Sequence, residues 1–535
     1  MRHNLRVFGI FAIAILAFCP GLSTCTVLGL AESMGPDGSN AQDVHALGYE
    51  GQGVNVGLIS QHNARADHEA FQGHVTNSDH SGDGILASDH DTAMAGIVAS
   101  RGGTSFPNDI GIAPQSDIYS ARVVDDLSQI SELYLKNALD DLVNTESCRV
   151  IVTGIQMVSL AANGVSAWTK IYDYYAYEFD VIFANAAGNY ETEISVFGDA
   201  YNGITTGGLR FTDTDVYGRV GAGSNSGPTV DGRDKPDVVC PSQSQTVPYA
   251  SSNTAWSTVG NTNGQTSWSV PHTAGVAALL LSYADSTLLE DDDDRSEVIK
   301  AVIVNSALPN IDDKDGNPTT METFNEDRGY GRIDALRAYD TLSAGRINEG
   351  ETTTKQMGWA YETQFDSGAP SDLSDSYFIT GKKDQRLVLT VTWHRRITRS
   401  GKFIFTYDIA DDQFDINLTV SGGVVVSEPD ILNNLEKRDV LLPSDGVYEI
   451  TLTKSNGAIS SDGYALAFEL VDPIPGDFDL NYVVDVADFA NVSTQWLMTG
   501  PGLEADLFVD GIIDISDLGV FVDNWLSYDP AYYSP

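Results

Sequence analysis

The sequence has little positive charge. Its 30 Lys and Arg residues are opposed by 75 Asp and Glu residues, which gives the 535-residue chain a formal net charge of -45. Nucleic acid and anionic membrane surfaces attract proteins of the opposite sign, so we expect neither as a partner. Hydrophobic residues still make up 42% of the chain, and 50 glycines supply many turns. This composition is typical of a folded protein with three or four domains of about 150 residues.

Long hydrophobic runs are also scarce. The apolar run Val7–Phe18 follows basic residues and precedes small ones, and it is too short to span a membrane comfortably. This layout is typical of a secretory signal peptide, which we assign to residues 1–31 with cleavage near Gly29–Ala31. The sequence therefore predicts a secreted or cell-surface protein without a membrane span after the signal is removed.

Cysteine is rare, with four residues in the chain. Cys19 and Cys25 lie in the signal segment, where neither follows the small residue expected at a lipid-anchor site. Cys148 and Cys240 could pair in an oxidising compartment or remain free thiols at strand ends, and the sequence leaves both possibilities open.

Residues 45–343 alternate short apolar strands with helical stretches such as Ser131–Asn144. An alternation of this kind predicts a parallel sheet covered by helices, with its site at the carboxyl ends of the strands. The predicted strands are Gly53–Ser60, Asp117–Val124, Arg149–Ile155, Val181–Gly188 and Ile204–Leu209.

Five segments of this region resemble, in the same order, the motifs of subtilisin-family serine proteases. They are Asp89–Ser100 around His90, Ala186–Asn189, Gly227–Pro241, Gly264–Ser282 around Ser267, and Gly329–Tyr339. The resemblance implies a subtilisin-like α/β fold. It also implies that Ser267 is the nucleophile, that His90 is its base and that Asn189 stabilises the oxyanion.

The aspartate position of the family is occupied by Ser60. The missing acid normally holds the tautomer of the histidine and stabilises the imidazolium, and a serine cannot supply that charge. Asp89 or Asp91 could provide a carboxylate from another direction, but we interpret both as solvated loop acids. The resemblance thus predicts an endopeptidase acting on polypeptides, impaired by the change at Ser60. The alternative is a non-catalytic pseudoprotease scaffold.

Residues 347–473 change to an alternation of polar and apolar residues with turn signals. We predict an all-β sandwich, which resembles the jelly-roll-like domain that often follows subtilisin-type catalytic domains. No catalytic constellation is present, so its expected role is stabilisation or substrate docking. The predicted strands are Arg386–His394, Lys402–Ile409, Phe414–Val420, Gly446–Lys454 and Gly463–Val471.

Residues 474–527 contain a duplication. Asp477–Leu497 realigns with Asp506–Leu526 at an offset of 506 − 477 = 29 residues. Each copy begins with the oxygen spacing of a calcium loop, and the two copies together resemble a dockerin. The resemblance implies a small α-helical module that binds Ca²⁺ and docks onto a cohesin-like partner. The implied ligands are Asp477, Asp479, Asn481, Val483 and Asp488 in the first loop, and Asp506, Asp510, Ile512 and Asp517 in the second.

The two loops differ in sequence. Phe508 replaces the third-position ligand of the second loop, so we expect that site to have fewer ligands. Gly511 stands at the sixth-position turn of the second loop, where the first loop has Tyr482. Because that turn favours glycine, we expect the first loop to be more strained.

Overall fold

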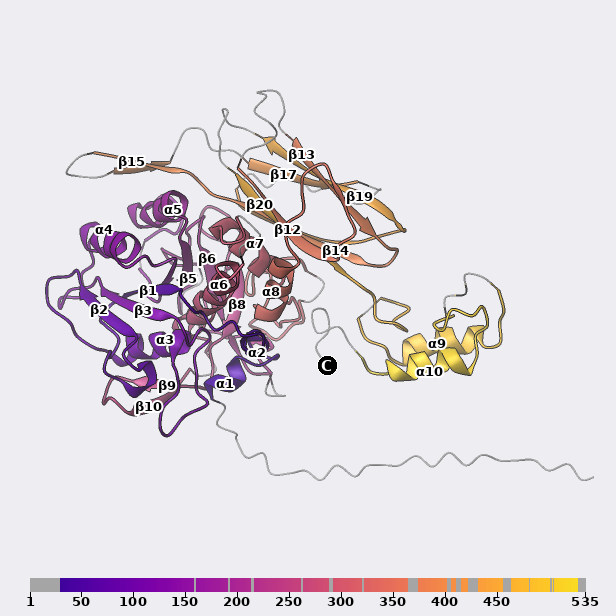
Figure 1. Ribbon diagram of the computed structural model, residues 1–535, viewed down its shortest axis with the longest axis horizontal. Helices are drawn as coiled ribbons and strands as arrows, with labels where there is room; N and C mark the ends of the chain where they lie inside the picture. The colour runs from indigo at the N-terminus through magenta and orange to yellow at the C-terminus, as the bar shows by residue number, and fades with distance from the viewer. Residues whose placement is uncertain are drawn as a thin grey trace, which may run out of the picture.

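The computed structural model describes residues 29–527 with short internal gaps, and the chain forms three successive regions (Figure 1). Residues 1–28, which hold most of the predicted signal peptide, lie outside the described part. In that part, no helix combines the length and the apolar character needed to cross a membrane. The internal residues that are not described are 158–159, 191–192, 213–215, 261–262, 288–291, 320–321, 364–373, 402–405, 410–414, 422–431, 456–462, 481, 501–502 and 504.

The first region is built on a parallel sheet with the order β2-β3-β1-β4-β5-β6-β7, and β8 also pairs with β6. The five predicted strands are present as β1, β3, β4, β5 and β6, all in parallel register, and only the short β7 runs antiparallel. The strands are β1 (Asn55–Ser60), β2 (Val75–Asp79), β3 (Asp117–Arg122), β4 (Val150–Thr153), β5 (Ile182–Ala186), β6 (Ile204–Arg210), β7 (Arg219–Val220) and β8 (Val238–Pro241). A separate hairpin is formed by β9 (Gln245–Tyr249) and β10 (Ala255–Val259).

Helices cover both faces of this sheet. Successive residues of a strand point to opposite faces, so neighbouring residues pack into different cores. Leu58 belongs to the core that contains α3 (Asp89–Ala99) and α6 (Val270–Ala284), whereas the next residue, Ile59, belongs to the core that contains α4 (Glu132–Asp140) and α5 (Ala167–Phe179). The remaining helices of the region are α1 (Leu30–Ser33), α2 (Ala41–Ala46), α7 (Ser296–Asn305) and α8 (Ala335–Ser343).

Helix α6 is the central helix of this region, and every residue from Val270 to Ser282 is buried. Its small residues allow close packing against its neighbours. A Cβ atom at Gly275 would lie 2.4 Å from the side chain of Ile112. Pro271 stands in the first turn, where its missing N–H leaves no hydrogen bond unmade. The helix therefore fixes the segment that precedes it, which contains Ser267.

The second region is β-rich, and its two four-stranded sheets have the orders β11-β13-β19-β17 and β12-β20-β14-β18. Apolar residues from both sheets share one core, as expected for sheets packed face to face. The strands are β11 (Thr352–Thr353), β12 (Met357–Glu362), β13 (Ser374–Gly381), β14 (Arg386–Trp393), β17 (Asp415–Val420), β18 (Leu435–Leu441), β19 (Gly446–Ser455) and β20 (Tyr464–Val471). The predicted strand Lys402–Ile409 is described only over β16 (Thr406–Ile409), which pairs with β15 (Ile397–Ser400).

The β-rich region is attached firmly to the α/β region. Helix α7 packs against β14 and β20, and the ammonium group of Lys437 donates hydrogen bonds to the carbonyls of Val304 at 2.9 Å and Asn305 at 3.1 Å. These carbonyls belong to the last turn of α7, so Lys437 caps that helix from the neighbouring region. Burial lowers the pKa of Lys437 to about 7.

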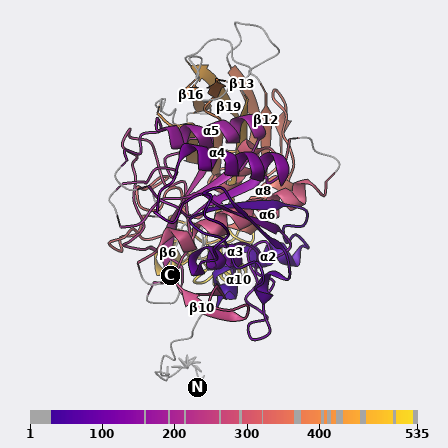
Figure 2. The ribbon, with the colours of Figure 1, turned by 90° about the vertical axis from the view of Figure 1, so that its left-hand side faces the viewer.

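The β15–β16 hairpin extends from the β-rich region and lies along α5 (Figures 1 and 2). Ile397 and Tyr407 of the hairpin are buried in the core between α4 and α5. The ring of Tyr407 lies 5.3 Å from that of Tyr174, and Arg395 at the base of the hairpin forms a buried ion pair with Asp173. The hairpin thus completes a core that the α/β region begins.

The third region contains two helices, α9 (Val486–Gln495) and α10 (Ile515–Asp523), around a small core. Its backbone has an approximate twofold repeat. Val484 N donates to Ser527 O at 2.9 Å, and Ile513 N donates to Met498 O at 3.0 Å. Each donor and each acceptor is separated from its counterpart by the same 29 positions (513 − 484 and 527 − 498). The sequence duplication is therefore also a duplication of structure.

Candidate active site

The nucleophile and base candidates lie on two elements that contact each other. His90 is the second residue of α3, and Ser267 lies in a 3₁₀ turn, Thr266–Trp268, immediately before α6. The rings of His90 and Trp268 are 5.3 Å apart between centroids. Ser267 is 7% exposed, whereas the side chain of His90 is 41% exposed and faces solvent.

The turn before Ser267 depends on Gly264. This residue has a φ of +72°, and a Cβ atom there would lie 2.6 Å from the Cα atom of Gly221. Within the described residues Ser267 Oγ and His90 are not hydrogen-bonded to each other. Catalytic hydrogen bonds commonly tighten only when substrate is bound, so this geometry is compatible with a serine–histidine pair.

Asn189 is held next to the serine turn. Its side-chain oxygen accepts a hydrogen bond from Thr266 N at 2.8 Å, and its own backbone N–H donates to Gln156 Oε1 at 2.6 Å. Because Oδ1 is engaged by Thr266, the Nδ2 amide is the end that remains for a ligand beside Ser267. Sequence reasoning did not identify Thr266 or Gln156, although the position of Thr266 directly before the nucleophile is a signal in itself.

The residue at the predicted acid position is engaged by the backbone. Ser60 ends strand β1, and its hydroxyl donates to the backbone oxygen of His62 and, at 3.4 Å, to that of Ala121. Among the described residues no hydrogen bond joins Ser60 to His90. The Ser60 hydroxyl is thus engaged by the backbone at the end of its strand.

The interpretation of Asp91 as a solvated loop acid is wrong. Its side chain is 2% exposed, and Oδ1 lies 3.2 Å from His90 Nδ1. Burial acts to raise the pKa of Asp91, but hydrogen bonds from His90, Ser88 and the His62 N–H outweigh it, and the pKa lies below its usual value. Asp89 differs, because it is only partly buried and accepts a hydrogen bond from Ala250 N at 3.0 Å.

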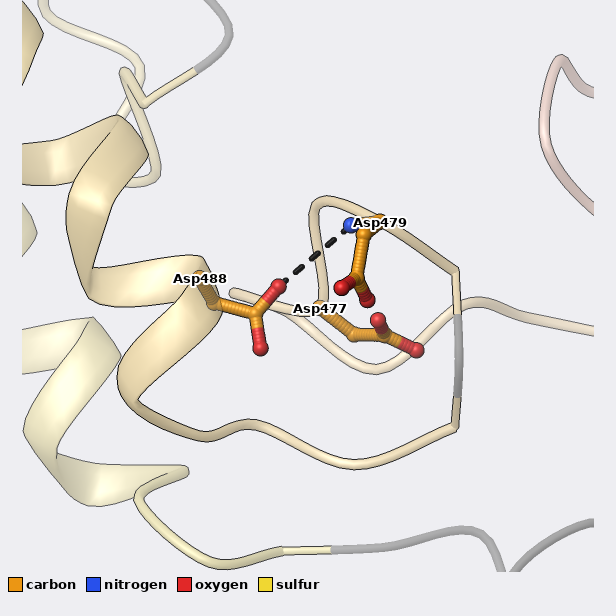
Figure 3. A group of neighbouring side chains, drawn as sticks. All are labelled: Asp477, Asp479 and Asp488. Carbon is orange, nitrogen blue, oxygen red and sulfur yellow. Dashed lines mark hydrogen bonds between the residues drawn. The ribbon is translucent and has the colours of Figure 1, made fainter.

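The first acidic loop of the third region brings three carboxylates together. Oxygens of Asp477, Asp479 and Asp488 lie within 4.8 Å of one another (Figure 3). Asp488 is buried at the start of α9 and accepts hydrogen bonds from the backbone of residues 478 and 479. Hard oxygen ligands at this spacing fit a calcium ion. The predicted ligand Asn481 lies outside the described residues, and Val483 follows it at the position of the carbonyl ligand.

The second loop has the same backbone but a looser acidic group. Asp517 is buried and accepts from Phe508 N at 2.9 Å, and Asp506 accepts from Gly511 N at 2.9 Å. In the part of the chain that is described, Asp506, Asp510 and Asp517 do not form a cluster like that of the first loop. Ile512 holds the position of the carbonyl ligand.

The expected strain in the first loop is present. Tyr482 has a φ of +73°, in the left-handed region that glycine favours, and its counterpart Gly511 has a φ of +82°. The two loops therefore share one backbone path although their sequences differ at this position.

The two cysteines outside the signal segment do not pair. Cys148 and Cys240 are both free and buried. Burial raises the pKa of the Cys240 thiol to about 12 and raises that of Cys148 further. Both thiols are therefore inert structural residues.

Candidates for a nucleophile, a base and an oxyanion donor at the carboxyl edge of a parallel sheet are the groups that a serine-hydrolase type of site requires. Residues 33–332 match the model of the subtilase family. Because this match covers more than half of the 535 residues, the chain belongs to the subtilase family of serine proteases.

Individual relatives are more distant. The chain is 29% identical to pyrolysin from Pyrococcus furiosus over 215 residues, which are 35% of this chain and 14% of pyrolysin. The chain thus spans 14% of the length of that relative. Among solved structures, the prenylagaramide maturation protease PagA is 20% identical with a TM-score of 0.44, covering 56% of this chain and 98% of PagA. The patellamide maturation protease PatA is 22% identical with a TM-score of 0.43, covering 55% of this chain and 97% of PatA.

Proposed function

We propose that this chain is a secreted serine endopeptidase that hydrolyses peptide bonds through an acyl-enzyme on Ser267. The observation that carries the proposal is the convergence of Ser267, His90 and Asn189 at one edge of the sheet. Thr266 and Trp268, the neighbours of the nucleophile, contact Asn189 and His90 respectively. A polypeptide is the substrate because the family to which the chain belongs consists of proteases.

The reaction uses each group once in each half-reaction. Ser267 Oγ attacks the peptide carbonyl while His90 Nε2 takes its proton, and the Asn189 amide donates to the oxyanion. The tetrahedral intermediate collapses, the C–N bond breaks, and His90 returns the proton to the leaving amine. Water then repeats the sequence on the ester and releases the acid product together with free Ser267.

A fluorophosphonate probe, which phosphonylates activated serines, tests this function. The mature protein should be labelled, and Ser267→Ala should lose the label. The matched control is Ser282→Ala near the end of helix α6, where Oγ donates to Leu279 O. An unlabelled wild-type protein, or labelling that persists in Ser267→Ala, contradicts the enzyme and favours the pseudoprotease scaffold.

For the third region we propose a dockerin-like module that binds Ca²⁺ and docks onto a cohesin-like partner. The carboxylate cluster of the first loop supports the ion, which would be held by Asp477, Asp479 and Asp488. The ion would offset the mutual repulsion of these carboxylates. The duplicated backbone supports the resemblance.

A repeated apolar surface supports the docking role. Three pairs of apolar residues in equivalent positions of the two copies are exposed to solvent, as expected of a surface that a partner covers. They are Val486 and Ile515 at 73% and 70%, Trp496 and Trp525 at 40% and 42%, and Leu497 and Leu526 at 68% and 62%. Calcium-dependent binding to an immobilised cohesin, lost in Val486→Asp and Ile515→Asp together, tests this role. Binding that is unaffected by the double substitution contradicts it.

A further inference from the structure

We propose that Asp91 is the positioning acid of this active site, so that the carboxylate that orients His90 comes from helix α3 and not from the end of strand β1. This inference rests on the proposed function and names the residue that completes its machinery. The acid and the base are then consecutive residues of one helix.

The geometry places the carboxylate on the correct nitrogen. Asp91 Oδ1 lies 3.2 Å from His90 Nδ1, and no other carboxylate of the described residues forms a hydrogen bond or ion pair with that ring. A carboxylate accepts only, so Nδ1 must carry the proton in this contact. The other nitrogen, Nε2, is then left as the acceptor for the proton of Ser267, which is the tautomer that a general base requires.

Asp91 is itself held in a fixed position. Its Oδ2 accepts from Ser88 Oγ at 2.7 Å and from His62 N at 3.0 Å. Ser88 is the N-cap of α3 and in turn accepts from Asp91 N at 3.1 Å, so the side chain and the first turn of the helix brace each other. A side chain locked by two donors can orient the ring that it contacts.

The carboxylate also remains charged. It lies in the first turn of α3, where the positive end of the helix dipole favours an anion. Its hydrogen bonds keep its pKa below the usual range despite burial. Asp91 can therefore stabilise the imidazolium that forms when His90 accepts a proton.

The contact with His62 N explains how a carboxylate on α3 can replace one at the end of β1. His62 lies two residues beyond Ser60, in the segment that leaves β1. The carboxylate from α3 therefore reaches the same segment that follows the family's acid position. The Ser60 hydroxyl donates hydrogen bonds to the backbone oxygens of His62 and Ala121. Asp91 on α3 is therefore the residue that approaches His90.

Asp91→Asn tests this role, because it retains the size of the side chain and removes its charge. We expect kcat to fall by about 10³- to 10⁴-fold with little change in KM, since the loss acts on the transition state. The matched control is Asp89→Asn, which removes the same charge from the same helix turn. It should change kcat by less than about tenfold, because Asp89 contacts Ala250 and not His90. Equal losses in the two variants, or full activity in Asp91→Asn, would overturn the proposal.

Ser60→Ala tests whether the orienting role lies instead at the end of β1. If the acid function resides on Asp91, this variant retains its kcat and its rate of fluorophosphonate labelling. A loss comparable to that of Asp91→Asn would return the orienting role to the end of β1 and overturn the proposal.

The tautomer of His90 gives a test in the unaltered protein, which stands even if Asp91→Asn fails to fold. The ¹⁵N shifts of the neutral ring should show the proton on Nδ1. A proton on Nε2 would overturn the proposal. The two proposals fail differently: an unlabelled protein with the proton on Nδ1 contradicts the protease, whereas a labelled protein with the proton on Nε2 contradicts only the role of Asp91.

Discussion

The α/β region and the third region, called the module below, hold the side chains of their candidate sites in place differently. Ser267 and His90 stand at the starts of helices that are anchored in a large core, and their neighbours are fixed by hydrogen bonds. The carboxylates of Asp477 and Asp479 lie on a loop and that of Asp488 lies at the start of α9, beside a small core. Like charges this close repel one another. The first site is thus built by its protein core, whereas the proposed second site would need a cation to complete it.

The largest difference should appear in stability. Leu280→Ala removes a fully buried side chain from α6 and should cost about 2–5 kcal/mol of unfolding free energy, measured by chemical denaturation. Its counterpart in the module is Ile515→Ala, where the side chain is 70% exposed and the cost should stay near 0.5 kcal/mol. Equal losses of unfolding free energy in the two variants would mean that the Ile515 side chain is buried against another part of the protein or against a second copy.

The next effect is on catalysis. Asn189→Ala should lower kcat by about 10²- to 10³-fold, the loss measured for an oxyanion donor in subtilisin. The matched control is Asn55→Ala at the amino end of β1, where the side chain donates to Glu146 O and is remote from the site. A large loss of kcat in the control would show that the substitutions act through the fold.

Removal of calcium should distinguish the stability of the module from that of the α/β region. In the full chain, a chelator should lower the unfolding free energy of the module by about 2.7 kcal/mol if the ion had been present at 100 times its Kd. The unfolding transition of the α/β region should not change. The two transitions are followed by differential scanning calorimetry. Asp488→Asn should abolish the response, whereas Asp523→Asn, at the end of α10, should retain it. A chelator effect on both transitions would contradict the separation.

The last effect is a dependence on pH that His272 should give to the stability of the α/β region. Burial lowers the pKa of His272, in α6, to about 3. Below the pH at which an unfolded histidine titrates, the unfolded chain gains a proton that the folded chain refuses, so stability falls by about 1.4 kcal/mol per pH unit on acidification. His272→Gln should flatten this slope in thermal unfolding. His74→Gln, whose side chain is 42% exposed, should change it less.

Five strands of the parallel sheet were predictable from sequence because they are largely buried on both faces and therefore read as apolar runs. Strand β2 was not predicted, because its residues after Val75 are polar and partly exposed. Ser267, His90 and Asn189 were predictable because each lies in a local motif, and the structure brings them to one edge. The position of Asp91 was not predicted. Its burial depends on Ser88 and on the backbone of His62, and the latter is remote in sequence. The spacing Ser88-x-x-Asp91 at a helix start was the available signal.

The attachment of the β-rich region could not be predicted either. An alternating pattern predicts strands and their buried face, but it does not indicate which helix will cover them. The cap that Lys437 provides for α7 joins positions 133 residues apart, and no local pattern records such a contact. The same holds for Thr266 and Asn189, which meet only after the sheet and α6 have formed.

The β15–β16 hairpin has a consequence for how this protein can evolve. Because Ile397 and Tyr407 fill a core that begins in the α/β region, a recombination event that exchanged the β-rich region for an unrelated domain would leave α5 with an uncovered apolar face. The two regions must therefore be inherited as one unit. The module after Val471 has its own core beyond a proline-containing linker, and Tyr482 contacts Arg386 of the β-rich region. Its exchange would break that contact but would not open the core between α4 and α5.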